Sequence, residues 1–189
     1  MTILKHTSYV IIFGIFLLGA CKGDQETKVT PEAIFQELTA HTDDNLFRGV
    51  KMGMKQDRVL AIETDRANDS KRKPLEQRKS EEELHFKFGI PELDSAYYEI
   101  NYQFDYLGLF EIHFDIHLKD EEDVADLFDY IQSVFDKKYG DNTDDGMFTT
   151  WYYETKRNAM VEISMVDDSK YHGSPMLSLF FHEQTIGDY

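Results

Sequence analysis

The sequence has little of several features that mark whole classes of protein. Its 189 residues contain one cysteine and four prolines, and Asp and Glu outnumber Lys and Arg by 36 to 20. This composition excludes a disulfide-rich, a collagen-like and a wholly disordered chain. The apolar run from Tyr9 to Ala20 is shorter than the roughly 20 residues that a membrane-spanning helix needs. With 41% hydrophobic residues, the chain has enough apolar side chains for one globular domain.

Motifs that carry chemistry are also scarce. The sequence has no Gly-x-Ser-x-Gly elbow for a nucleophilic serine and no glycine-rich loop that would hold a phosphate. Outside the first twenty residues and the segment with His113 and His117, four histidines are scattered singly (His41, His85, His172 and His182) and form no recognisable catalytic pattern. The sequence therefore nominates no catalytic residue and no cofactor, and it favours a non-enzymatic protein.

The amino terminus has the order of an export signal. A short polar start with Lys5 precedes the apolar run, as in secretory leaders, so residues 1–20 are predicted to be a signal peptide. The run ends in Leu18-Gly19-Ala20-Cys21, which resembles the lipobox that signal peptidase II cleaves in bacterial lipoproteins. The resemblance implies that Cys21 carries diacylglycerol, and usually that the new amino terminus is acylated, for instance with palmitate. Several acyl chains, each stabilised by about 0.8 kcal/mol per buried methylene, hold a protein at a bilayer.

The residues after Cys21 bear on where the protein resides. Lys22, where the inner-membrane retention signal would have Asp, implies by the same resemblance an outer-membrane lipoprotein. Residues 21–30 are polar and aperiodic, so they are predicted to be a flexible tether. The domain would then occupy 31–189 and face either the periplasm or the medium.

The first half of this domain is predicted to be mostly helical. Thr30-Pro31 is a helix-start pair, followed by an apolar face with Ile34, and a second short helix is predicted over 55–65 after a glycine turn at Gly53. Residues 66–82 contain almost no apolar side chains and several basic ones. They are predicted to form a mobile charged loop that is solvated, or that contacts lipid headgroups or the acidic half of the protein.

Further along the chain the hydrophobic period changes to two. Alternation predicts strands around Phe86, Ile100 and Phe114, the last two joined by a hairpin turn at Gly108. Asp120 then caps a helix with an apolar stripe at helical spacing, which ends at Gly140. Three further strands are predicted over 147–154, 159–166 and 176–182.

This order predicts an α+β protein with a two-layer architecture. Antiparallel strands with one apolar face need a second layer that buries this face. We therefore expect an antiparallel sheet with helices on one face, and the order of the elements favours a tandem αβββ repeat. Gly53, Met54 and Val59 resemble the glycine and valine of the first helix in BamE (SmpA)-type envelope lipoproteins and the related β-lactamase-inhibitory-protein fold. The Gly-x-Pro that follows in that family has no counterpart at positions 63–65. The resemblance implies the fold alone and no functional residue.

The negative charge lies in one half of the chain. Residues 1–91 contain 14 basic and 14 acidic side chains, whereas residues 92–189 contain 6 and 22. Such a surface repels nucleic acid, so it favours either a basic protein partner or solubility alone. The acids expected on the outer face of the second-half helix are Asp123, Asp126 and Asp129, and they are candidates for partner binding.

One predicted strand places potential metal ligands on a single face. His113, Asp115 and His117 alternate with apolar residues, beside Glu111, at a spacing of about 6.8 Å along the strand. Neighbours so far apart cannot meet one zinc ion without a ligand from another strand. These residues are therefore either weak metal candidates or the wet face of a one-sided sheet. They are also the site of an alternative function, a ligand-binding or hydrolytic lipoprotein with a site near His113.

Three aromatic residues complete the candidates. Trp151, Tyr153 and Phe180 are predicted to lie on strand faces opposite the core, where they would form a recognition patch, or else they pack beneath a helix. Together, these features favour a lipid-anchored, non-enzymatic protein-binding module of the scaffold, assembly or inhibitor type.

Overall fold

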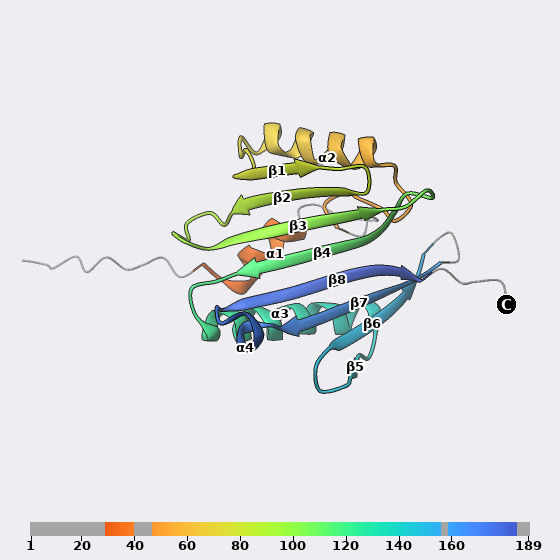
Figure 1. Cartoon of the computed structure of the whole chain (residues 1–189). Coiled ribbons are helices and arrows are strands. Elements are labelled where there is room, and N and C mark those ends of the chain that lie inside the picture. The colour runs from red at the N-terminus through yellow and green to blue at the C-terminus, as the bar shows by residue number, and fades with distance from the viewer. Residues whose placement is uncertain (1–28, 40–46, 156–158, 185–189) are drawn as a thin grey trace, which may run out of the picture.

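The computed structural model of the chain describes residues 29–39, 47–155 and 159–184. The predicted α+β class is confirmed, because these residues form one open, entirely antiparallel sheet of eight strands with the order β1-β2-β3-β4-β8-β7-β6-β5 (Figure 1). The strands are β1 (Glu76–Lys79), β2 (Glu83–Gly89), β3 (Tyr97–Phe104), β4 (Leu109–His117), β5 (Thr143–Asp144), β6 (Thr149–Glu154), β7 (Met160–Asp167) and β8 (Met176–Gln184). The helices are α1 (Pro31–Thr39), α2 (Gln56–Asp69), α3 (Glu121–Tyr139) and α4 (Ser169–His172). No helix in these ranges is both long enough and apolar enough to cross a bilayer.

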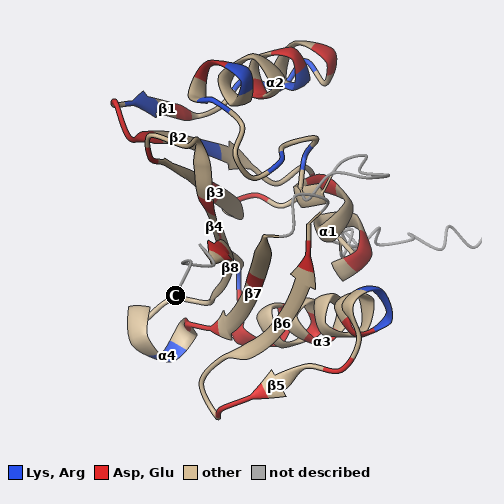
Figure 2. Cartoon of the chain, turned by 90° about the vertical axis from the view of Figure 1, so that its right-hand side faces the viewer, with Lys and Arg blue, Asp and Glu red and all other residues tan. Residues whose placement is uncertain are grey.

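The core lies on one face of the sheet. Directly paired residues form a continuous apolar row across five neighbouring strands, namely Phe86, Ile100, Phe114, Leu179 and Met165, and all five are buried. The helices α1, α2 and α3 pack on this face, as Figure 2 shows for α1 and α3 beside the sheet. The predicted two-layer arrangement is therefore the observed one.

The helix α3 has every predicted feature. Asp120 caps it by accepting a hydrogen bond of 3.0 Å from the backbone N–H of Asp123, and Lys137 and Lys138 lie in its last turn. Its buried stripe consists of Val124, Leu127, Ile131 and Phe135. A long helix with a cap, a stripe and a terminating glycine satisfies several independent local requirements, which is why sequence alone located it.

The chain order repeats a unit of one helix followed by four antiparallel strands. α2 precedes β1 to β4, α3 precedes β5 to β8, and the two units join where β4 pairs with β8. The prediction of three strands per unit was wrong, because each unit has a fourth, edge strand, β1 or β5. Neither edge strand has a buried residue. A short edge strand pairs through its backbone and needs no apolar face, so hydrophobic alternation could not reveal either of them.

The predicted mobile loop over 66–82 was also wrong. α2 continues to Asp69, and Glu76–Lys79 forms the edge strand β1, in which Gln77 pairs with Phe86 of β2. The four side chains of β1 are exposed, and charged side chains on an edge strand discourage pairing with another chain.

A bulge changes the faces at the start of β4. The register shifts after Gln103, so that Phe104 pairs with Leu109. Leu109 is therefore buried. Phe110 is an even-numbered residue like the buried Ile112 and Phe114, so alternation predicts it in the core, but it is only half-buried and lies edge-on to His182. An extra residue in one strand moves the side chains that follow to the other face, and local periodicity cannot detect it.

The β3–β4 hairpin positions the start of α2. As predicted, the turn ends at Gly108, whose N–H donates to the carbonyl of Asp105. The strand that follows is bonded to the segment before α2, because the N–H of Gly53 donates to Leu109 O at 2.7 Å and the N–H of Leu109 donates to Met54 O at 2.8 Å. A Cβ on Gly108 would lie 2.5 Å from Gly53 O, so this close approach requires glycine.

Candidate functional site, an arginine-lined cleft

An open cleft of about 1090 Å³ lies between α1 and the carboxyl end of α2. Phe88 of β2 and Tyr98 of β3 belong to its lining, and both residues are buried parts of the sheet. The remaining lining residues are Ala33, Gln36, Glu37, Thr39, Arg48, Gly49, Arg66, Ala67, Asp69, Ser70 and Arg72. Three arginines in one cleft are notable in a chain of net charge −16.

Arg48 enters the cleft from a tight turn. Phe47 and Val50 form an isolated bridge, and the two residues between them, Arg48 and Gly49, have φ of 54° and 78°. Positive φ is uncommon for an arginine and costs about 1 kcal/mol or more, so other contacts must hold Arg48 there. The turn directs its side chain inward.

Those contacts are a buried ion pair with Glu63 of α2. Arg48 donates from Nε to Oε1 and from Nη2 to Oε2 of Glu63, each at 2.8 Å, and the side chains are 2% and 0% exposed. Burial alone would raise the pKa of Glu63, but the charge and hydrogen bonds of Arg48 outweigh burial and hold that pKa below its usual value. Two parallel N–H···O bonds are the strongest geometry for this pair.

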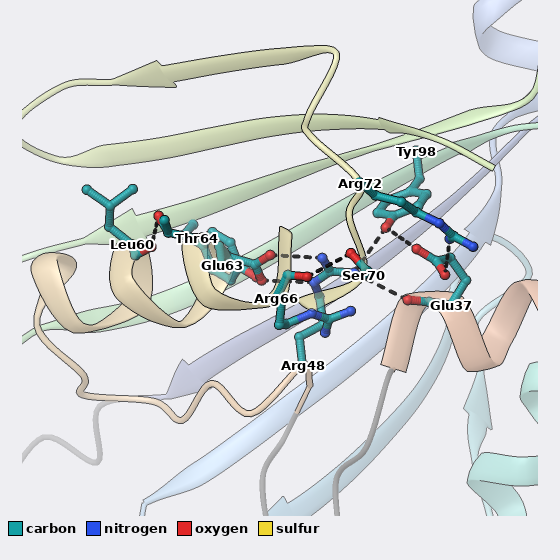
Figure 3. A network of polar contacts seen from close by, with 10 residues as sticks. Glu37, Arg48, Leu60, Glu63, Thr64, Arg66, Ser70, Arg72 and Tyr98 are labelled. Atoms are coloured by element: carbon teal, nitrogen blue, oxygen red, sulfur yellow. Dashed lines mark hydrogen bonds and ion pairs between the residues drawn. The ribbon is translucent and has the colours of Figure 1, made fainter. Parts of the chain in front are cut away.

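Two tyrosines of β3 complete the network. Tyr102 donates its hydroxyl hydrogen bond to Oε1 of Glu63 at 2.6 Å, and Tyr98 accepts from Nη1 of Arg48 at 3.1 Å while donating to Oε1 of Glu37 at 3.0 Å. Burial raises the pKa of Tyr98 to about 12, so both hydroxyls stay protonated and act as donors near neutral pH. Figure 3 shows how this network spans α2, the sheet and α1.

Arg66 differs from the other arginines of the cleft. Its Nη1 is buried and has no hydrogen-bond partner among the described residues. Burial lowers the pKa of Arg66, and the charge of the neighbouring Arg48 lowers it further. Glu63 is close to both arginines, but Arg48 already binds both of its oxygens. The cleft thus contains a guanidinium with an unsatisfied donor beside an already occupied carboxylate.

The rim of the cleft is joined by a second ion pair. Arg72, which follows α2, donates from Nη1 to Oε2 of Glu37 on α1 at 2.6 Å. Both oxygens of Glu37 are then occupied, one by Tyr98 and the other by Arg72. Glu37 and Glu63 are thus each held in an ion pair with an arginine, and Arg66 is the arginine of the cleft with an unsatisfied donor among the described residues. The chemistry that this arrangement favours is recognition of an anion.

The residues predicted around His113 lie elsewhere, on the opposite face of the sheet. Nε2 of His113 lies 2.9 Å from Oδ1 of Asp115, the ring of His113 stacks on Phe180, and His117 stacks on Tyr97. Within the described ranges no group of three or more His, Cys, Asp or Glu residues converges on a point where a metal could bind.

Ser178, on the same face, does not have the contacts of a catalytic serine among the described residues. Ser178 donates its hydroxyl hydrogen bond to Asp115 at 2.7 Å and is 1% exposed. A nucleophilic serine must instead be bonded to a histidine that takes its proton and must be reachable by substrate. Burial opposes ionisation of Asp115, but the hydrogen bonds from His113 and Ser178 lower its pKa, so it remains a carboxylate.

The three predicted patch aromatics do not share a face. Trp151 is 1% exposed on the core face, where its Nε1 donates to Oδ1 of Asp136 in α3 at 2.8 Å. Tyr153 stacks on Tyr139 of α3, and only Phe180 lies on the opposite face of the sheet. The exposed aromatic patch was therefore a wrong prediction, and the alternative of packing beneath a helix holds for Trp151 and Tyr153. Residues 151–153 are all aromatic, so no alternation of apolar and polar residues indicated which of them face the core.

The acids of α3 are where the helical period placed them. Asp126 and Asp129 are exposed, and Asp123 is partly exposed in the first turn. In Figure 2 the red of acidic residues recurs along the ribbon of this helix, which lies apart from α2. The role of these acids in binding a partner stays a prediction.

Sequence reasoning did not find the cleft, although one signal was present. Val59, Glu63 and Arg66 follow one another at spacings of four and three, so they share a helix face. A charged residue on the same face as a buried Val59 has to be paired, and Glu63 at a core position was such a residue. The partner Arg48 belongs to a turn with no periodic pattern.

Comparison of the chain with family models, with curated proteins and with solved structures finds no match. The resemblance to BamE-type proteins therefore stays an expectation. The predicted leader, the predicted lipidation site Cys21 and most of the predicted tether lie outside the described residues.

Proposed function

We propose that this protein is a lipid-anchored, non-enzymatic binding module of the cell envelope, and that the arginine-lined cleft receives a segment of a partner protein. The anchor is the acylated Cys21, which follows a leader resembling those of bacterial lipoproteins. The resemblance favours the outer membrane, with the folded domain in the periplasm or facing the medium.

One observation carries the binding role, namely that the buried Nη1 of Arg66, in an open cleft, has no acceptor among the residues that the structure describes. Buried donors are almost always satisfied in folded proteins, and an exception calls for an explanation such as an absent ligand. Glu37 and Glu63 are each held in an ion pair, which fixes two of the arginines at the cleft and suits recognition of an anion.

Photo-crosslinking in intact cells tests this role. A photoreactive phenylalanine analogue replaces the exposed Gln36 at the rim of the cleft, or Asp129 on the acidic face of α3 as the comparison position. We expect a discrete crosslinked protein from position 36. A product from position 129 alone would instead support the acidic face and a basic partner, and it would refute the cleft as the binding surface.

The anchor has a separate test. The Cys21→Ala variant should lose incorporation of a labelled fatty acid and accumulate as an uncleaved precursor. An unchanged acyl label on this variant would contradict the lipoprotein assignment and leave the crosslinking result unaffected.

A further inference from the structure

Two of the three arginines in the cleft are held in ion pairs. Arg48 pairs with Glu63 through two bonds, and Arg72 pairs with Glu37 on the other side of the cleft. Arg66 lies near Arg48 and Glu63 but forms no ion pair with a described residue, although Asp69 also lines the cleft.

Two aromatic rings lie beside the neighbouring guanidinium, that of Arg48. The Cζ atom of Arg48 lies 5.2 Å from the ring centroid of Phe88 and 5.5 Å from that of Tyr98. Both rings line the cleft. A ligand that reached Arg66 would thus lie beside the guanidinium of Arg48 and near these two largely buried rings.

We propose that the cleft binds one carboxylate of a protein segment, either an acidic side chain or a chain terminus, through the guanidinium of Arg66. This inference rests on the proposed function and names the group that the cleft recognises. A planar guanidinium matches a carboxylate through two parallel hydrogen bonds, and the acceptor would satisfy the buried Nη1.

Two observations favour this ligand over a phosphate and over a small metabolite. A carboxylate brings one negative charge to the one arginine of the cleft that is in no ion pair with a described residue, whereas a phosphate dianion would place a second negative charge near Glu37 and Asp69, which also line the cleft. The volume of about 1090 Å³ reaches the top of the range of roughly 300–1,000 Å³ typical of small-molecule pockets. An open cleft of this size suits several linked residues.

Titration of the purified full chain with small probes tests the inference. N-acetyl-phenylalaninate carries a carboxylate and a ring, and N-acetyl-phenylalaninamide is its neutral counterpart. NMR of the arginine side-chain N–H groups should show a saturable shift at Arg66 with the carboxylate, and the amide should bind at least tenfold more weakly. Equal binding of the two probes, or tighter binding of phenylphosphonate, would overturn the assignment.

Matched variants place the effect at one residue. Arg66→Gln should weaken carboxylate binding at least tenfold, Arg66→Lys should give an intermediate loss, and Arg58→Gln, a change of the same charge at an exposed position of α2, should leave it unchanged. Circular dichroism verifies that each variant is folded. Equal affinity in wild type and Arg66→Gln would refute the role of Arg66.

The chain's own acids are the remaining control. Asp43 and Asp44 belong to the segment outside the described residues, so the Asp43→Asn/Asp44→Asn variant is titrated in parallel. We expect wild-type affinity, and binding that appears only in this variant would overturn the proposal in favour of an internal carboxylate. A partner crosslinked from position 36 together with no carboxylate preference would refute this inference and leave the proposed function standing.

Discussion

Arg48 and Glu63 form a two-bond ion pair that is almost wholly removed from solvent, with both N···O distances at 2.8 Å. The pair joins a turn before α2 to the inner face of α2 itself. It also fixes the position from which Arg66 faces the cleft, so stability and recognition share the same few groups.

Breaking this pair should destabilise the fold strongly. Glu63→Gln leaves a buried guanidinium without its counter-charge, which costs about 3–5 kcal/mol. The double replacement Arg48→Met/Glu63→Leu should cost less than Glu63→Gln alone. Urea unfolding of these two variants measures the difference. Asp57→Asn, which removes the exposed partner of Lys79 on the same helix, should change little. Equal losses in Glu63→Gln and Asp57→Asn would contradict the importance of the buried pair.

The same pair predicts a pH dependence. The pKa of Glu63 is lower in the folded protein than in the unfolded chain, because the charge and hydrogen bonds of Arg48 outweigh the effect of burial. Its contribution is therefore fully present above the unfolded pKa of about 4.3 and is lost as the pH falls through the folded pKa. The difference in unfolding free energy between wild type and Glu63→Gln should stay constant at neutral pH and shrink below about pH 4. A difference that widened in acid would contradict this sign.

The unsatisfied guanidinium of Arg66 should lower the unfolding free energy of the ligand-free protein. An unsatisfied buried donor costs about 1–3 kcal/mol, and because Arg66 is only half-buried we expect Arg66→Gln to raise the unfolding free energy by about 1 kcal/mol. Arg58→Gln is the matched control and should have no such effect. If Arg66→Gln instead destabilised the protein, the guanidinium would already be paired within the chain.

Trp151 should matter for folding. Its ring packs edge-on against Phe135 and its Nε1 donates to Asp136, so Trp151→Phe should cost about 1–3 kcal/mol and Trp151→Ala about 3–5 kcal/mol. Tyr152, the next residue, is exposed, and Tyr152→Ala should stay within about 0.5 kcal/mol of wild type. Thermal unfolding of the three variants separates a core role from a surface role.

Two glycines with positive φ distinguish backbone strain from steric contact. Gly146 has φ of 87° and open space where a Cβ would lie, so Gly146→Ala should cost only the strain, about 1–2 kcal/mol. Gly108 has φ of 133°, and its Cβ would meet Gly53 O at 2.5 Å, so Gly108→Ala should cost clearly more. Gly108→Ala should also weaken the hydrogen bonds that join Gly53 and Leu109 before α2, so the amide hydrogens of these two residues should exchange faster. Equal costs at the two positions would contradict the close approach.

The accuracy of the sequence predictions follows how local each signal was. The cap, stripe and terminal glycine of α3 lie within one stretch of chain, and the alternation around Ile100 and Phe114 repeats every second residue, so both were located correctly. β1 has only exposed, polar side chains, and its existence depends on pairing with β2, so it was taken for a loop.

The sequence by itself determined the α+β class, the inward face of most strands and the acidic surface of α3, because each depends on a short periodic pattern. Only the tertiary structure decided that Trp151 faces the core and that Arg48, Glu63 and Arg66 meet beside Phe88 and Tyr98. These residues come from a turn, a helix and two strands, and no local pattern relates the turn and the strands to the helix. They are brought together because the sheet and its helices can bury their apolar faces in one arrangement, which leaves the charged groups to pair where the chain places them.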